Sequence, residues 1–240
     1  MFSSLFSFSL FLLLLSFFSP WLCTEQTIPE MCNSTNSSLN QLVIINEKLV
    51  DFDELLKIGF NLWKTVSEQG WSGYFEMLSG FTYPSLVKEF WINASIVELN
   101  SECAILSRVT NISITVTSKA IANVIICGEI GEIPGTLVWD YYLPTWHIFV
   151  DPSKTSEVSN LLPEAVVWCQ LLNSNLLPKD KDLDLVDPIE QDLLLFLNSD
   201  LKIDLPQVMF DHLKRTLSSF QKGRIFSIPF GRVILELLVQ

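Results

Sequence analysis

The stretch GWSGYFEMLSGFTYPSLVKEFWINA, residues 70–94, decides much of the fold because it places seven aromatic side chains close together in the chain. If these side chains face inward, they bury a large apolar area. A surface that stacks nucleic-acid bases would pair them with Arg and Lys, but the only base in the stretch is Lys88, near Glu76 and Glu89. We therefore interpret the stretch as core packing. The seven residues are Trp71, Tyr74, Phe75, Phe81, Tyr83, Phe90 and Trp91.

Helix signals lie on both sides of this stretch. Asp51, with Glu54 three residues later, predicts a helix start, and Gly70 predicts its end. Between them, one helix face is apolar and carries Leu55, Ile58, Leu62 and Val66. A second helix is predicted after Thr82, with Thr82 as its cap and Pro84 in its first turn.

Alternating residues predict strands at 95–99 and 105–117. Further helices are predicted from Ser118, over 153–173, from Asp187 with Pro188 and Glu190, and from Asp204. The fold class that follows is α+β, mainly helical, with a small antiparallel sheet near residues 95–117 in a single domain.

The chain begins with an uncharged apolar run, residues 2–23, which is near the length of a membrane span. We predict residues 1–23 to be a signal-like or anchor segment. Residues 24–49 are rich in Ser, Asn and Thr and predict a polar linker. Residues 50–240 form the predicted domain, and because the sequence stops inside an apolar helix we expect it to be truncated at its C-terminus.

Entry into the secretory route would expose four N-x-S/T sequons to glycosylation. They begin at Asn33, Asn36, Asn93 and Asn111, the last within a predicted strand. The five cysteines are widely spaced and contain no C-x-x-C. Four remain if cleavage removes Cys23, enough for two disulfides, but isolated buried thiols are the favoured interpretation.

The net charge of −12, from 27 acidic and 15 basic residues, disfavours bulk binding to nucleic acid, which needs Lys and Arg. A basic stretch at 213–232 is the exception. We interpret it as a solvated surface, with a phosphate-binding patch as the alternative. Its members are Lys214, Arg215, Lys222, Arg224 and Arg232.

No catalytic constellation is evident in the sequence. The two histidines, His147 and His212, are far apart, so no local zinc motif can be drawn. We place His147 in the core and His212 on a helix surface. The carboxylates that could serve a two-metal mechanism, Asp140, Asp151, Asp187 and Asp192, are expected in loops, caps or exposed faces. The prediction is a non-enzymatic protein with no cofactor.

Several segments follow one another as in a known family. They are Gly70-Trp71 with Phe75, YPSLVKEFWIN (83–93), VTNISITVTSKAIANVI (109–125), NSNLLPKD (173–180) and IDLPQVMFDHL (203–213). Over about residues 60–238 this order resembles the "putative plant transposon protein" domain, found in retroelement-derived reading frames. The resemblance implies origin in a plant mobile element and no catalytic residue.

Three functions stay open. The first is a non-catalytic module that binds an unknown protein partner or has lost its function. The second is a secreted or membrane-anchored, envelope-like glycoprotein, held at the membrane by residues 1–23. The third is a transposase-type nucleic-acid-binding protein, which the acidic charge disfavours. A working leader implies the secretory pathway or a membrane; without one, the nucleus or cytoplasm is expected.

Overall fold

The computed structural model describes residues 42–239 apart from 100, 136–147, 152 and 224–226. The predicted leader, residues 1–23, lies outside the described residues. So do the sequons at Asn33 and Asn36 and the residues Asp140, His147 and Arg224. Among the residues that are described, no helix combines the length and the apolar character needed to cross a membrane.

The last residues of the predicted linker are part of the fold. Strand β1 (Val43–Ile44) pairs in parallel with β5 (Ser227–Ile228), and Leu42 is buried in the core. The Asn175 side chain donates to the Lys48 carbonyl over 2.7 Å. We call residues 42–50 the N-terminal strap. The linker predicted over 24–49 therefore gives way to packed structure at Leu42.

The helix predicted from Asp51 to Gly70 is two helices, α3 (Phe52–Lys57) and α4 (Leu62–Gln69). Asp51 caps the first as expected, since its Oδ1 accepts the Glu54 N–H at 2.9 Å. The break falls at Gly59, whose φ of 101° lies in the left-handed region that glycine enters without steric cost. Apolar periodicity alone did not reveal this turn.

The aromatic stretch forms α5 (Ser72–Met77) and α6 (Pro84–Asn93). Core packing is confirmed for the five aromatics with buried side chains. Phe81 and Tyr83, in contrast, are 83% and 49% exposed, so core packing is the wrong interpretation for these two. The residue at the N-cap of α6 is Tyr83, not the predicted Thr82, and no side chain caps the helix. The five buried residues are Trp71, Tyr74, Phe75, Phe90 and Trp91.

The antiparallel sheet has the strand order β2-β3-β4, with β2 at Ser95–Leu99, β3 at Glu102–Val109 and β4 at Ile112–Val116. The strand predicted over 105–117 is thus a hairpin. Its turn residues, Thr110 and Asn111, have φ values of 48° and 69°, as a two-residue hairpin turn of mirror-image type requires. Helix α7 (Ser118–Ile125) follows, capped by Thr117 instead of the predicted Ser118.

The helix predicted over 153–173 begins only at Pro163. A 3-10 turn, η3 (Val158–Asn160), precedes α8 (Pro163–Leu171), which continues as a π-helical turn, η4 (Leu172–Leu176). Asp187 and Glu190 form the predicted capping box of α9 (Pro188–Asn198). Asp204 caps α10 (Leu205–Gln221), and α11 (Gly231–Val239) ends the described chain.

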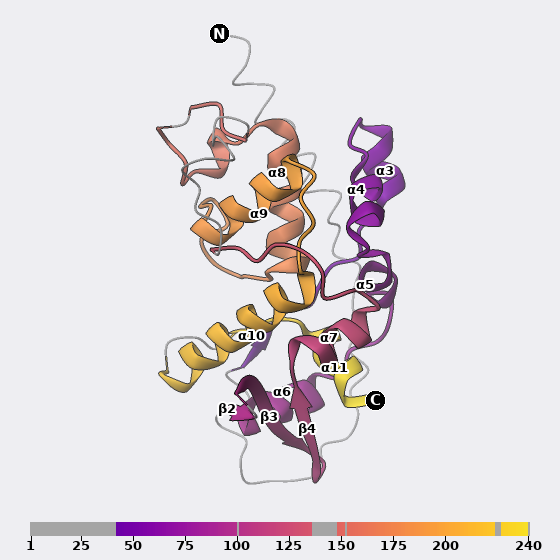
Figure 1. The fold of residues 1–240 in the computed structure, drawn as a ribbon, viewed down its shortest axis with the longest axis vertical. Helices are drawn as coiled ribbons and strands as arrows, with labels where there is room; N and C mark the ends of the chain where they lie inside the picture. The colour runs from indigo at the N-terminus through magenta and orange to yellow at the C-terminus, as the bar shows by residue number, and fades with distance from the viewer. Residues whose placement is uncertain (1–41, 100, 136–147, 152, 224–226, 240) are drawn as a thin grey trace.

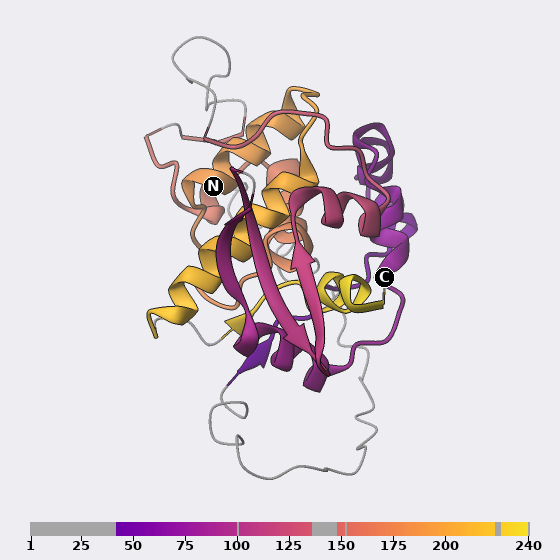
Figure 2. The same ribbon diagram turned by 60° about the horizontal axis from the view of Figure 1, so that its bottom comes forward.

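These elements share one hydrophobic core, and the observed class is α+β with a small antiparallel sheet. Figure 1 shows α8 and α9 at the end of the molecule opposite the sheet, with α10 crossing between them. Helix α6 packs on β3, and α7 contacts both α10 and α11. Figure 2 shows one face of the sheet turned toward the viewer, with β2 and β4 as its two edge strands.

Candidate functional site

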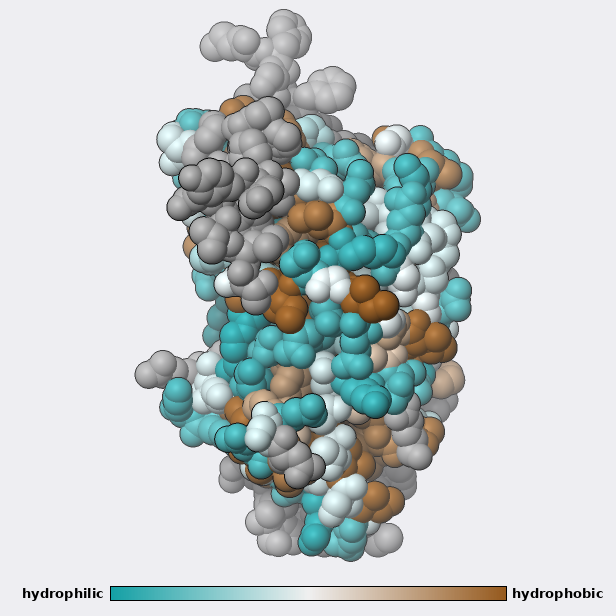
Figure 3. All heavy atoms as spheres, viewed as in Figure 1, coloured by the Kyte–Doolittle hydropathy of each residue, from teal (hydrophilic) through white to brown (hydrophobic). Residues whose placement is uncertain are grey.

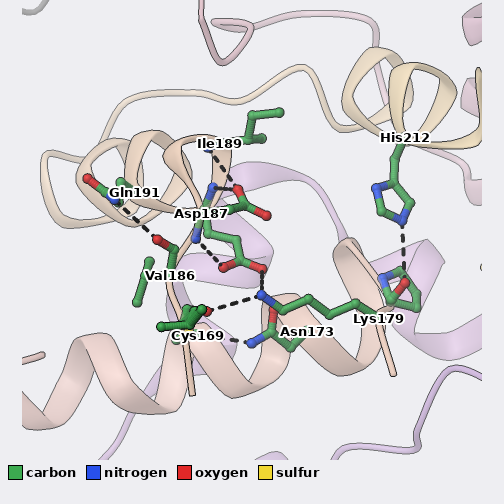
Figure 4. A network of polar contacts seen from close by, with 11 residues as sticks. Cys169, Asn173, Lys179, Val186, Asp187, Ile189, Gln191 and His212 are labelled. Atoms are coloured by element: carbon green, nitrogen blue, oxygen red, sulfur yellow. Dashed lines mark hydrogen bonds and ion pairs between the residues drawn. The ribbon is translucent and has the colours of Figure 1, made fainter. Parts of the chain in front are cut away.

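The most concentrated polar cluster lies where α8 turns back into α9. Lys179 comes from the connection after η4, whereas Asp187 and Glu190 come from the start of α9. Glu190 is fully buried, at 0% exposure, and the Lys179 side chain is 20% exposed. Figure 4 shows Lys179 reaching from this connection toward the first turn of α9.

The polar groups of the cluster bind one another and the neighbouring backbone. The Lys179 ammonium lies 2.6 Å from Glu190 Oε1 and donates to the Leu185 carbonyl over 3.2 Å. Glu190 Oε2 accepts the Asp187 N–H at 2.9 Å, and Asp187 Oδ1 accepts the N–H groups of Ile189 and Glu190. This is a capping box with a lysine added to it, and it closes the 177–187 connection onto α9.

Burial sets the protonation of the neighbouring groups. Desolvation raises the pKa of Glu190, and the hydrogen bond from Lys179 opposes that shift. Burial likewise raises the pKa of Cys169 to about 12, and Asn173 Nδ2 lies 3.6 Å from its sulfur. A thiol with such a pKa carries almost no thiolate at neutral pH, so Cys169 is inert as a nucleophile.

His212 does not lie on an open helix surface, so that prediction was wrong. It is partly buried on α10, with Nε2 3.3 Å from the Pro178 carbonyl oxygen. Its ring stands edge-on to Phe230 with centroids 5.5 Å apart. Burial lowers the pKa of His212 to about 4. An efficient general base has a pKa near the working pH, and this histidine is far below it.

The aspartates predicted to lie in loops and caps have separate roles. Asp151 binds Ser153 in a loop, and Asp187 is the α9 cap. Asp192 is buried instead of exposed, and its Oδ2 accepts the Gly135 N–H at 2.8 Å. Across the described part of the chain, no group of three or more His, Cys, Asp and Glu residues is placed to hold a metal ion.

The basic stretch is divided between elements with different surroundings. On α10, Lys214 pairs with Asp211 at 2.8 Å, and Arg215 Nε donates to the Asp211 carbonyl. Lys222 is exposed at the end of that helix. Arg232, on α11, pairs with Glu236 and donates to the carbonyls of Met77 and Phe81. Arg232 is thus used inside the fold, where it ties α11 to the turn after α5.

Both described sequons are on the surface. Asn93 is exposed at the end of α6, and its Nδ2 donates to the Arg108 carbonyl at 2.8 Å. Asn111 is exposed in the β3–β4 turn, not within a strand as predicted. Of the described cysteines, Cys103 is exposed, Cys127 is half-buried and Cys169 is buried, and all three are free thiols. Only Cys169 fits the expectation of a buried thiol.

A surface hollow of about 410 Å³ lies between the start of α7 and the middle of α10. Its walls mix both signs of charge, with Lys119 and Lys214 facing Glu102 and Glu129. Ser118 Oγ donates to Glu129 Oε1 at 3.0 Å, so a carboxylate of the protein already lies at the start of α7.

The outer edge of β4 is the most distinctive exposed feature. In a two-residue hairpin the flanking pair, here Val109 and Ile112, exchanges hydrogen bonds across the turn. Ile112, Ile114 and Val116 therefore bond to β3, whereas Ser113 and Thr115 direct their N–H and C=O groups outward. No hydrogen bond to these outward groups is found within the described ranges.

Sequence reasoning missed the longest-range contacts. Glu47, in the N-terminal strap, accepts the N–H groups of Arg232 and Val233 at the start of α11, and burial raises its pKa. For the Lys179–Glu190 pair, the sequence indicated only the helix start at Asp187, with Glu190 as a cap residue. The one local signal was the capping-box pattern of Asp187 and Glu190, which marks the start of α9 but does not identify Lys179 as the partner of Glu190.

Comparison with known proteins agrees with the sequence resemblance. Searches of curated proteins and of solved structures found no significant match. Residues 67–240, the greater part of the chain, match the family described as "Putative plant retrotransposon-related domain". The chain belongs to this retrotransposon-related family of plant domains.

Proposed function

We propose that this protein is a non-catalytic module that acts by binding another protein chain. The observation that carries the proposal is the open edge of β4, where outward backbone groups of an uncharged strand lie on the surface. Unpaired strand edges bind extended segments of other chains through main-chain hydrogen bonds.

The buried polar groups support a structural role over a chemical one. Glu190 and Lys179 bind the backbone of their own connection, Glu47 binds the start of α11, and His212 packs against Pro178 and Phe230. Glu47, Glu190 and His212, whose pKa values burial shifts, are thus each engaged in a contact that stabilises the fold. Perturbed groups gathered in a cleft would instead favour an active site.

The exposed apolar side chains are consistent with protein association, but the proposal does not rest on them. Phe81, Ile126 and Ile130 are each more than three-quarters exposed. Figure 3 shows the apolar residues of one face in several separate places among hydrophilic ones. Scattered apolar residues are ordinary on protein surfaces, so the strand edge is the more informative feature.

The test is sedimentation of the purified full chain over a wide concentration range, in mild detergent because of its apolar N-terminus. Association with itself, or with a protein captured at fixed stoichiometry and mapped to β4, supports the proposal. A chain that stays monomeric and binds no protein, yet turns over a substrate or binds DNA, overturns it.

The envelope-like glycoprotein is a second candidate, favoured by the exposure of Asn93 and Asn111. Glycosylation of either residue requires entry into the secretory route. Expression of the tagged full chain in plant cells, followed by fractionation and glycosidase treatment, decides this candidate. A mass shift on glycosidase treatment supports it, whereas an unmodified soluble chain in the cytosol or nucleus removes it.

Nucleic-acid binding has less support, because Lys214 and Arg232 are engaged in ion pairs. The same purified chain can be titrated with duplex and single-stranded DNA at several salt concentrations. Binding that weakens steeply with salt would indicate phosphate contacts and would favour the transposase-type alternative.

A further inference from the structure

We propose that the partner of the β4 edge is β4 of a second copy of this chain, so that two copies pair antiparallel and join their sheets into one. This inference rests on the proposed function and specifies its partner. Three features support it: the hairpin geometry, the self-complementarity of the strand and the absence of charge from β4, in contrast to the other edge of the same sheet.

The outward groups of β4 are self-complementary. Antiparallel neighbours in a hydrogen-bonded pair exchange both of their N–H···O=C bonds. With a two-fold axis through Ile114, Ser113 of one copy lies opposite Thr115 of the other, and the reverse pair is identical by symmetry. All the outward N–H and C=O groups of Ser113 and Thr115 in both copies are then satisfied, with no residue left over.

The side chains match in the same register. Ser113 and Thr115, both exposed in the single chain, become direct cross-strand neighbours, and hydroxyl pairs of this kind stabilise sheets. Ile114, partly buried, meets its own copy on the other face. Ile112, which is 62% exposed at the hairpin tip, comes level with Val116 of the second copy, whose side chain is fully buried in its own core.

The edge lacks the features that prevent such pairing. Natural edges carry Lys, Pro, a bulge or a covering element, yet β4 reads ISITV with no charge and no proline. The opposite edge, β2, carries the exposed Glu98, and helices contact both edge strands, α10 at β2 and α7 and α11 at β4. The two edges therefore differ in charge, since β2 carries a carboxylate and β4 has no charged residue that would repel its own copy.

Cysteine cross-linking of the full chain tests the register. All variants carry Cys103→Ser, because Cys103 is exposed and would react without specificity. Directly opposed residues in a non-hydrogen-bonded antiparallel pair have Cα atoms about 4.5 Å apart, within the range of a disulfide. Ile114→Cys should therefore form a disulfide-linked dimer under mild oxidation, whereas Glu98→Cys on the other edge should not.

The neighbouring positions give a sharper control. Ser113→Cys alone should cross-link poorly, since Ser113 faces Thr115 of the second copy and not itself. A mixture of Ser113→Cys chains and Thr115→Cys chains should cross-link well. Equal cross-linking of Ile114→Cys, Ser113→Cys and Glu98→Cys would show random collision and overturn the proposal.

Sedimentation of Ile112→Lys provides an independent readout, with Glu98→Lys as its matched control. Ile112 is exposed, so the fold should tolerate lysine, which circular dichroism checks. We expect the dimer dissociation constant to rise about tenfold or more for Ile112→Lys only, equivalent to about 1.4 kcal/mol. If the chain dimerises but neither the cysteine cross-linking nor Ile112→Lys affects β4 as expected, the β4–β4 contact is contradicted. The proposed function would still stand. The β4–β4 contact is also contradicted if this chain stays monomeric and its β4 edge binds a different protein.

Discussion

At the scale of single residues, the buried Lys179–Glu190 pair is the contact most sensitive to change. Removing one partner of a buried ion pair leaves an uncompensated charge, which costs about 3–5 kcal/mol. Because Lys179 is partly exposed, we expect Lys179→Met to lower the free energy of unfolding by about 3 kcal/mol. Urea unfolding followed by circular dichroism measures this.

The matched control is the double variant Lys179→Met with Glu190→Gln. It removes both charges and keeps an oxygen that can accept the Asp187 N–H, so it should be more stable than Lys179→Met alone. If the free energy of unfolding of Lys179→Met lies within about 0.5 kcal/mol of the wild-type value, the pair does not stabilise the 177–187 connection.

His212 should make the fold sensitive to acid. Its pKa falls from 6.5 to about 4 on burial, so the unfolded chain takes up a proton at a pH where the folded chain does not. Its contribution is therefore present above pH 6.5 and is lost as the pH falls toward 4. The loss between pH 7 and pH 4.5 should be about 2 kcal/mol.

The measurement compares wild type with His212→Gln, whose side chain can still reach toward Pro178. Burial raises the pKa of Glu47 and Glu190, so these carboxyls favour the folded state as the pH falls, the opposite sign. They are present in both proteins, and the difference between the two curves isolates His212. Parallel curves from pH 7 to pH 4.5 would contradict the assignment.

At the scale of elements, the β3–β4 turn has a sequence that its geometry does not favour. Thr110 and Asn111 both have positive φ values, and a β-branched residue is strained there. The double substitution Thr110→Asn with Asn111→Gly introduces the Asn-Gly pair that such a turn prefers. It should raise the free energy of unfolding by about 1 kcal/mol. Thermal unfolding of the double variant checks this, and a lower midpoint would contradict it.

At this scale, the sequence predicted the features that depend on residues close together in the chain. Asp51, Asp187 and Asp204 were identified as caps, and each accepts the expected backbone N–H, because capping depends on residues three apart. The turn at Gly59 was missed because the apolar helical pattern continues across it. The hairpin turn at Thr110 was missed although the alternation shifts by one residue there, from Val109 to Ile112. The same limit applies to Lys179, because its pairing with Glu190 depends on how η4 and α9 pack.

At the scale of the whole molecule, the match to the family begins at residue 67, but the fold begins earlier. Leu42, Leu55, Leu62 and Val66 are each at most 3% exposed, so residues before the matched region supply part of the core. Glu47 and Lys48 add hydrogen bonds to α11 and to Asn175. The polar composition of 24–49 concealed this role, because only its last residues pack.

We therefore expect a chain that starts at residue 67 not to fold alone, whereas one that starts at residue 40 should. Each buried large apolar side chain contributes about 1.5–3 kcal/mol, so the four lost with residues 42–66 are worth about 6–12 kcal/mol. A whole domain is stable by only about 5–15 kcal/mol. Circular dichroism and limited proteolysis of the two fragments decide the matter, and a cooperative unfolding transition in the shorter fragment would show that the strap and the α3–α4 pair are dispensable.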